Sequence, residues 1–257
     1  MEKSVKCLRM RILSWNINGL RSLKGDLNER LKSLKADIIC VQETKVTRKC
    51  GALYFTCVDI KSLNYHFSLG DMLEECHAIL PDFTSYFAFS RKRSGYSGVA
   101  IYCAANATPY AAKEGIAGSV SAYESESQSR VDEEFSPEEL KELDAEGRAV
   151  VTWHKTDGGK SVVVINVYCP RADPERRDRL LYKMKFYKLL EMRAEALLGA
   201  GHSVIIVGDV NTSHKQIDHC DPYEVRYVRL CVCARRMQLV WYGKLSFVNR
   251  CLCFTGF

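Results

Sequence analysis

The chain has 257 residues, of which 47% are hydrophobic and 26% charged, a composition that is typical of globular proteins and excludes global disorder. At about 150 residues per domain, this length predicts one or two domains. No apolar run reaches the roughly 18 residues needed to cross a bilayer, and the first residues lack the apolar core of a secretory signal. We therefore expect neither a membrane span nor secretion.

The net charge of +6 comes from the end of the chain. Residues 225–257 hold six basic and no acidic side chains, which leaves 31 basic and 31 acidic residues in 1–224. The overall charge therefore does not indicate what the body of the chain binds, and nucleic-acid binding has to be argued from particular sites. The 12 cysteines show no spacing typical of a disulfide framework, which predicts a reduced, intracellular protein.

Short apolar runs alternate with helical patterns along the chain, which predicts an α/β fold. The predicted strands, in chain order, are residues 9–15, 36–41, 83–90, 97–103, 147–154, 161–168 and 204–207. The turn Asp157-Gly158-Gly159 predicts that two of them form an antiparallel pair. The predicted helices lie at Leu27 to Leu34, at 71–80, after the N-cap Ser136, and after Asp173-Pro174.

Three segments do not fit this alternation. Residues 121–136 contain five serines and five acids, which predicts a mobile surface loop. Residues 49–70 interrupt the approach to the second helix and are interpreted as an insertion. Residues 223–257 form a basic, cysteine-rich tail that differs in composition from all that precedes it. We therefore predict one domain in residues 1–222.

Three predicted strands end in oxygen-rich groups: Ser14-Trp15-Asn16, Gln42-Glu43-Thr44 and Gly208-Asp209-Val210-Asn211. Ligands of α/β sheets bind outside the carboxyl ends of strands, so we expect these groups to converge. The set contains carboxylates and amides without Cys or His, which suits a hard cation such as Mg²⁺. Each residue alone has an alternative, since strand-terminal Asn and Asp commonly form turns and Trp15 suits core packing. Together and in this order, they predict a metal site.

Five motifs carry a resemblance to a known family: Ser14-Trp15-Asn16, Gln42-Glu43-Thr44, Gly95-Tyr96-Ser97-Gly98-Val99-Ala100, Val167-Tyr168-Cys169-Pro170 and Gly208-Asp209-Val210-Asn211. In this order they resemble the exonuclease III type of apurinic/apyrimidinic endonucleases, within the endonuclease/exonuclease/phosphatase superfamily. The resemblance covers residues 8–48, 71–118 and 133–222. The resemblance is closest to one branch of that family, as indicated by Tyr168-Cys169-Pro170 and the run 185–211.

The resemblance implies a four-layer α/β sandwich, in which two facing mixed β-sheets are flanked by helices. It also implies cleavage of phosphodiester bonds in double-stranded DNA, at abasic sites and 3′ ends, with Mg²⁺ as cofactor and Mn²⁺ as a substitute. A nuclear location follows from the resemblance alone, and a mitochondrial pool stays open. The sliding-clamp motif of full-length relatives has no counterpart here, so we expect no clamp partner and a monomer.

The resemblance also assigns roles to individual residues. The expected metal ligands are Asn16, Glu43, Asp209 and Asn211. Asp209 is expected to orient or deprotonate the attacking water, Asn211 to hydrogen-bond the phosphoryl oxygens, and Tyr168 to contact the scissile phosphate. The candidate substrate-binding residues are Asn18 and Arg171. Alternatively, Tyr168 is an aromatic residue at the end of a strand without a catalytic role, and Arg171 is a solvated side chain.

The family's closing motifs, an Arg-Leu-Asp-Tyr type and a final Ser-Asp-His, have no match in this sequence. Asp218-His219 lies only nine residues after Asp209, where the family has a structural Ile-Asp. We therefore expect a sandwich that lacks its C-terminal strands and a chain of impaired activity. A retained intron or an incorrect gene model would explain both the tail and the insertion.

Two other functions stay open at this stage. One is an inactive or misfolded product that binds DNA weakly at most. The other is a different phosphodiesterase of the superfamily, acting on phospholipids or inositol phosphates. The motifs Gly95 to Ala100 and Val167 to Pro170 favour DNA over these substrates.

Overall fold

Two mixed β-sheets face each other at the centre of the computed structural model, which describes residues 10–47, 73–118, 125–156, 161–173, 175–212 and 252–253. The first sheet has the order β3-β4-β2-β1-β9. Its strands are β1 (Arg11–Asn16), β2 (Ile38–Gln42), β3 (Phe83–Ala88), β4 (Val99–Ala104) and β9 (Leu252–Cys253). Strands β1 and β2 are parallel, whereas the other pairs of this sheet are antiparallel.

The second sheet has the order β5-β6-β7-β8. Its strands are β5 (Ala111–Glu114), β6 (Ala149–Lys155), β7 (Ser161–Tyr168) and β8 (Ser203–Asp209). The predicted antiparallel pair is confirmed as β6 and β7, and β8 adds to β7 in parallel. Strand β5 was not predicted, since its residues Ala-Ala-Lys-Glu carry no strand pattern.

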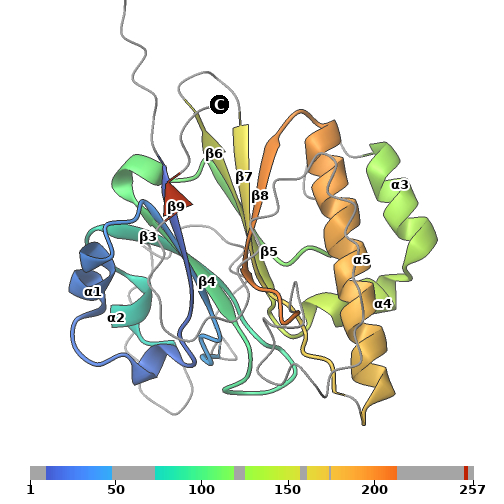
Figure 1. Cartoon of the computed structure of the whole chain (residues 1–257), viewed down its shortest axis with the longest axis horizontal. Coiled ribbons are helices and arrows are strands. Elements are labelled where there is room, and N and C mark those ends of the chain that lie inside the picture. Colours follow the sequence, from blue (N-terminus) through green and yellow to red (C-terminus); the bar gives the residue numbers. More distant parts are fainter. Residues whose placement is uncertain are drawn as a thin grey trace, which may run out of the picture.

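Helices cover the outer face of each sheet, so the chain has the predicted four layers (Figure 1). Helices α1 (Leu27–Ser33) and α2 (Glu75–Ala78) lie beside the first sheet, and α3 (Ser125–Glu134), α4 (Pro137–Asp144) and α5 (Arg177–Gly199) lie beside the second. Two short 3₁₀ helices lie at Leu20–Ser22 and Ala105–Ala107. None of the described helices is long and apolar enough to cross a membrane.

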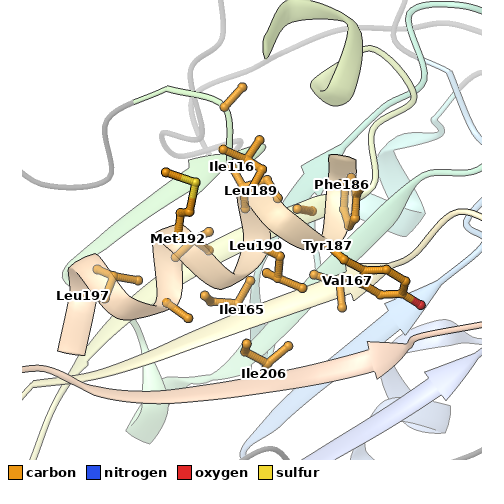
Figure 2. Packing of buried hydrophobic residues seen from close by; sticks show 14 of the residues in the cluster. Ile116, Ile165, Val167, Phe186, Tyr187, Leu189, Leu190, Met192, Leu197 and Ile206 are labelled. Carbon is orange, nitrogen blue, oxygen red and sulfur yellow. The ribbon is translucent and has the colours of Figure 1, made fainter. Parts of the chain in front are cut away.

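Three apolar clusters separate the four layers. Between the sheets lie small and branched side chains, among them Ile38, Ile101, Val150, Val164 and Ile205. A second cluster joins α1 and α2 to the first sheet. The third joins α5 to the second sheet, where Leu190 of the helix lies over Ile165 and Ile206 of the strands and Leu189 lies beside Ile116 (Figure 2). At about 25 cal/mol per Å² of buried apolar surface, these clusters supply the main driving force for folding.

The predicted loop at 121–136 is wrong for most of its length, because residues Ser125–Glu134 form α3. Val131 and Phe135 are buried in the cluster that contains α5. A spacing of four residues places both on one helical face, and their burial outweighs the polar composition around them. The next helix is confirmed, with Ser136 and Glu139 forming a capping box at the start of α4.

Several predictions fall on residues that lie outside the described part of the chain. These are the insertion 49–70, the turn Asp157-Gly158-Gly159, the pair Asp218-His219 and most of the tail. The expectation of missing C-terminal strands therefore stays a prediction. Of the tail, residues Leu252–Cys253 form β9, in which Leu252 pairs with Ile12 at the edge of the first sheet. Of the predicted helix at 71–80, the structure describes residues 73–80, and among these only Glu75–Ala78 are helical.

Candidate active site

Four strands, two from each sheet, end at the same edge of the sandwich. Asn16 ends β1 and pairs in register with Gln42 at the end of β2, and Glu43 follows directly. Tyr168 ends β7 and pairs in register with Asp209 at the end of β8. Because each pair of strands is parallel and the sheets face each other, their polar ends meet, as the sequence predicts.

The Asn16 side chain joins the two sheets at this edge. Its Nδ2 donates to Glu43 Oε1 at 2.8 Å and to Asp209 Oδ2 at 2.9 Å. One amide group thus holds two carboxylates that belong to different sheets. The predicted convergence of these three residues is therefore present in the structure.

Lys45 is a member of the site that the sequence analysis missed. Its Nζ lies 3.1 Å from Glu43 Oε2 and also donates a hydrogen bond to Oδ1 of the exposed Asn18. The Asn18 backbone N–H in turn donates to Asn16 Oδ1 at 3.1 Å. A lysine three residues beyond a strand is ordinary on a surface, so the sequence carries no signal that marks it.

Glu43 is ionised in this environment. Burial alone would raise the pKa of its carboxyl, but hydrogen bonds from Asn16, Lys45 and Tyr168 outweigh burial and hold the pKa below its usual value. Burial and the negative charge of Glu43 raise the pKa of the Tyr168 hydroxyl. Tyr168 therefore stays protonated at neutral pH, and its hydroxyl donates a hydrogen bond to the Glu43 carboxylate.

The backbone around the site adopts unusual conformations. Asn18, Glu43, Lys45 and Asn211 have φ angles of 50°, 56°, 52° and 51°, in the left-handed region that disfavours side chains. Such residues cost about 1–3 kcal/mol each and persist where the surrounding structure holds them.

The motif Gly95 to Ala100 supplies part of this support. Thr44 and Lys45 donate backbone N–H groups to Gly98 O at 3.0 Å and Ser97 O at 2.9 Å. A Cβ on Gly98 would lie 2.3 Å from Thr44 Oγ1, so only glycine fits there. This motif therefore holds the loop after β2 in place.

Asn211 and Asp209 are joined within the loop that follows β8. The Asn211 backbone N–H donates to Asp209 Oδ1 at 3.0 Å, and Asn211 Nδ2 donates to the carbonyl of Cys169 at 2.8 Å. Burial raises the pKa of the Cys169 thiol to about 12, so this residue is a protonated, uncharged neighbour. Asn211 thus lies beside the site, bonded to a carboxylate that contacts Asn16.

Arg148 is the second residue that the sequence analysis missed. Its Nη2 donates to Tyr96 Oη at 2.8 Å, and its Nε donates to Glu146 at 2.6 Å. Glu146 also accepts two hydrogen bonds from Arg179, at 2.7 and 3.2 Å. Burial alone would raise the pKa of Glu146, but both guanidinium groups hold it below its usual value. This buried ion network supports the end of β7.

A pair of buried amides connects the sheets beneath the site. Gln42 Nε2 donates to Asn166 Oδ1 at 2.7 Å, and Asn166 Nδ2 donates to the carbonyls of Val41 and Ala100 at 3.0 and 2.9 Å. Asn166 is fully buried, so these bonds offset the cost of placing its amide between two apolar layers.

Arg171, a predicted substrate-binding residue, does not join this cluster. It is exposed just beyond Pro170, and within the described ranges it makes no hydrogen bond to the site residues.

The residues at the strand ends suit a divalent cation. Glu43 and Asp209 offer two partly exposed carboxylates, and the Asn16 amide oxygen, which accepts from the Asn18 N–H, lies on the far side of the same amide group. Lys45 offsets one of the two negative charges, and the remaining charge is one that a cation would offset. Oxygen ligands of this kind are those that Mg²⁺ and Mn²⁺ prefer.

Comparisons with known proteins show the family to which the chain belongs. The model of the Endonuclease/Exonuclease/phosphatase family matches residues 13–249, and the chain belongs to that family. It is 49% identical over 227 residues to DNA-(apurinic or apyrimidinic site) endonuclease 2 of Xenopus laevis, a match over 84% of this chain and 38% of the relative. The corresponding protein of Homo sapiens is 47% identical over 231 residues, 82% of this chain and 40% of the relative. The predicted resemblance is thereby confirmed.

Solved structures show the same fold. The crystal structure of the Xenopus laevis APE2 catalytic domain has a TM-score of 0.66 and 50% identity, covering 83% of this chain and 62% of that one. The AP endonuclease LMAP of Leishmania major has a TM-score of 0.54 at 18% identity, over 80% of this chain and 56% of that one. This chain spans about 40% of the length of the curated relatives named above.

Proposed function

We propose that this chain carries the core of a DNA repair nuclease that hydrolyses phosphodiester bonds at abasic sites and 3′ ends with Mg²⁺ or Mn²⁺. The observation that carries the proposal is the Asn16 amide, which joins Glu43 and Asp209 across the two sheets. The similarity to DNA-(apurinic or apyrimidinic site) endonuclease 2 supports DNA, rather than phospholipid or inositol phosphate, as the substrate.

Asp209 is the group that we assign to the attacking water. Its two oxygens accept from Asn16 Nδ2 and from the Asn211 backbone N–H, so the carboxylate has a fixed direction. A carboxylate held in this way can orient a water molecule or take its proton. Asn16, Glu43 and Asp209 would hold the metal ion, which supplies positive charge next to the phosphate when bound.

Tyr168 and Asn211 are the proposed phosphate-contacting groups. Both are neutral, so they can approach a phosphodiester that a carboxylate would repel. The Tyr168 hydroxyl is protonated and already directed at Glu43. Asn18 and Arg171 are exposed beside these residues and are proposed to contact the DNA backbone.

The test is single-turnover cleavage of an end-labelled duplex with one abasic site in Mg²⁺. We expect Asp209→Asn to abolish the cleavage that the parent shows. Asp178→Asn, an exposed Asp on α5 that pairs with Arg176, is the matched control and should leave the rate unchanged. Equal rates for the parent and Asp209→Asn would contradict the proposal, as would faster turnover of soluble phosphate esters than of the duplex.

The expectation of impaired activity stays a prediction. The sequence holds one Asp-His pair, at Asp218-His219, and no Ser-Asp-His. Groups that act as a unit on one phosphate are strongly non-additive. We therefore expect this 257-residue chain to cleave at least about a thousandfold more slowly than a full-length relative, so the assay needs excess protein and long incubation.

A further inference from the structure

The backbone is tightly constrained where β8 ends and the next loop begins. Gly208 has a φ of 131°, and a Cβ on it would lie 1.9 Å from the carbonyl oxygen of Val167 on the neighbouring strand. Asn211 has a φ of 51°. Gly208 adopts its φ without strain, but the left-handed conformation of Asn211 costs free energy and persists only where surrounding contacts hold it.

Two side chains of α5 supply such contacts. Lys183 Nζ donates to the Asn211 carbonyl at 2.7 Å. The Tyr187 hydroxyl donates to the Val210 carbonyl and lies 2.7 Å from Thr212 Oγ1. Lys183 and Tyr187 are four residues apart, so they share one face of the helix, and Figure 2 shows the Tyr187 hydroxyl pointing out of the apolar cluster.

A lysine at position 183 is unfavourable for the stability of the fold. It is 8% exposed, and its ammonium lies 5.5 Å from the centre of the Tyr187 ring. Burying an ammonium costs free energy unless polar partners compensate for the lost water. Leucine or methionine would fill the same place without that cost, so the polar contact with Asn211 explains the lysine better than packing does.

We propose that Lys183 and Tyr187 are positioning residues that hold the carbonyls of Val210 and Asn211 so that Asp209 and Asn211 face the strand-end site. The connection runs through the Asn211 backbone, whose N–H donates to Asp209 Oδ1. Fixing residues 210–212 therefore also fixes the carboxylate direction. This inference rests on the proposed function, since it assigns α5 a part in that same reaction.

Tyr187→Phe is the variant of choice, because it removes only the hydroxyl and keeps the buried ring. Its matched control is Tyr182→Phe, on the same helix, whose hydroxyl donates to the Leu143 carbonyl of α4 at 3.2 Å. We expect amide hydrogen exchange at Asn211 to become up to about tenfold faster in Tyr187→Phe and to stay unchanged in Tyr182→Phe, the effect of one lost hydrogen bond.

The kinetic readout separates positioning from general stability. In Tyr187→Phe we expect single-turnover cleavage to fall about tenfold, the size of one neutral hydrogen bond, with unchanged affinity for the abasic duplex. Lys183→Met should act in the same way, and Lys183→Arg should restore part of the rate because it keeps a donor.

The two measurements distinguish failure of this inference from failure of the proposed function. Unchanged Asn211 exchange in both Tyr187→Phe and Lys183→Met would overturn the positioning role. An equal loss of rate in Tyr182→Phe would do the same. If Asn211 exchange responds but neither parent nor variant cleaves DNA, the contact from α5 is supported and the proposed nuclease activity is not.

Discussion

The guanidinium of Arg148 lies 4.8 Å from the centre of the Tyr168 ring, and its Nη1 donates to the Tyr168 carbonyl at 2.9 Å. One side chain thus fixes both the backbone and the ring of the tyrosine that donates to Glu43. Such a cation–π contact in a desolvated place is worth about 2 kcal/mol, in addition to the ion pair with Glu146.

Arg148→Met should lower the free energy of unfolding by about 3 kcal/mol, because it removes one partner of a buried ion pair. Arg176→Met, which breaks an exposed pair with Asp178, is the matched control and should cause no measurable change. Urea denaturation at neutral pH compares the two. An equal loss of unfolding free energy in both variants would show that the buried Arg148 network stabilises the fold no more than an exposed ion pair does.

Glu43→Gln should weaken the binding of Mn²⁺ at least about tenfold, because it removes one of the two carboxylates on the Asn16 amide. Glu29→Gln on α1 makes the same change on an exposed helix, where Glu29 pairs with Lys32, and should leave the affinity unchanged. Electron paramagnetic resonance of free Mn²⁺ measures both. Equal affinity of parent and Glu43→Gln would remove this residue from the metal site.

Gly208→Ala should cost more stability than Gly201→Ala, although both glycines have positive φ angles of 131° and 86°. A Cβ at Gly201 meets nothing within 4 Å, whereas one at Gly208 collides with Val167 O. An alanine at either position is strained by about 1 kcal/mol or more because of its positive φ. Only at position 208 does the collision of its Cβ with the Val167 carbonyl add to this cost. Thermal unfolding gives the comparison, and equal midpoints would contradict the collision.

His154 should make the protein less stable in acid. Its Nδ1 lies 2.9 Å from the Ala107 carbonyl, which can only accept, so Nδ1 carries the proton of the neutral ring and donates it in a hydrogen bond. The unprotonated Nε2 therefore accepts from Thr152 Oγ1 at 2.9 Å. Burial lowers the pKa of His154 from 6.5 to about 4. Because the folded-state pKa is depressed, the stability from this group is complete above about pH 6.5 and is lost as the pH falls toward 4.

The expected loss is about 3 kcal/mol over that window, at 1.36 kcal/mol per pKa unit. Urea denaturation of the parent and His154→Gln between pH 7 and 4 measures it, with the variant expected to show a flatter dependence on pH. Parallel curves for the two proteins would exclude His154 as the cause of acid sensitivity.

The strand ends were predictable because hydrophobic runs and parallel pairing follow local rules. Asn16, Glu43 and Asp209 each follow an apolar run, and the rule for carboxyl ends brings them together without knowledge of the side-chain contacts. The start of α4 was predictable for the same reason, since Ser136 and Glu139 are only three residues apart. Helix α3 was not, because its burial depends on contacts with α5.

Lys45 and Arg148 escaped prediction because their roles come from tertiary partners. Arg148 donates to Tyr96 and Tyr168, which lie 52 and 20 residues away in sequence. No pattern around Gly147 and Arg148 distinguishes a buried guanidinium from the exposed one that is usual for this residue type. The support of the site is therefore visible only once the sheets are in place.

The bond between Asn16 and Asp209 joins residues 193 positions apart, so it has consequences for the order of folding. Contacts with so large a separation in sequence form slowly, since a long stretch of chain must be closed before they are made. In a molecule in which only the first sheet has formed, Asn16 and Glu43 are in place but Asp209 is not. In one in which only the second sheet has formed, Asp209 is in place without the other two. Affinity for Mn²⁺ during refolding would therefore report the moment at which the two halves of the sandwich dock.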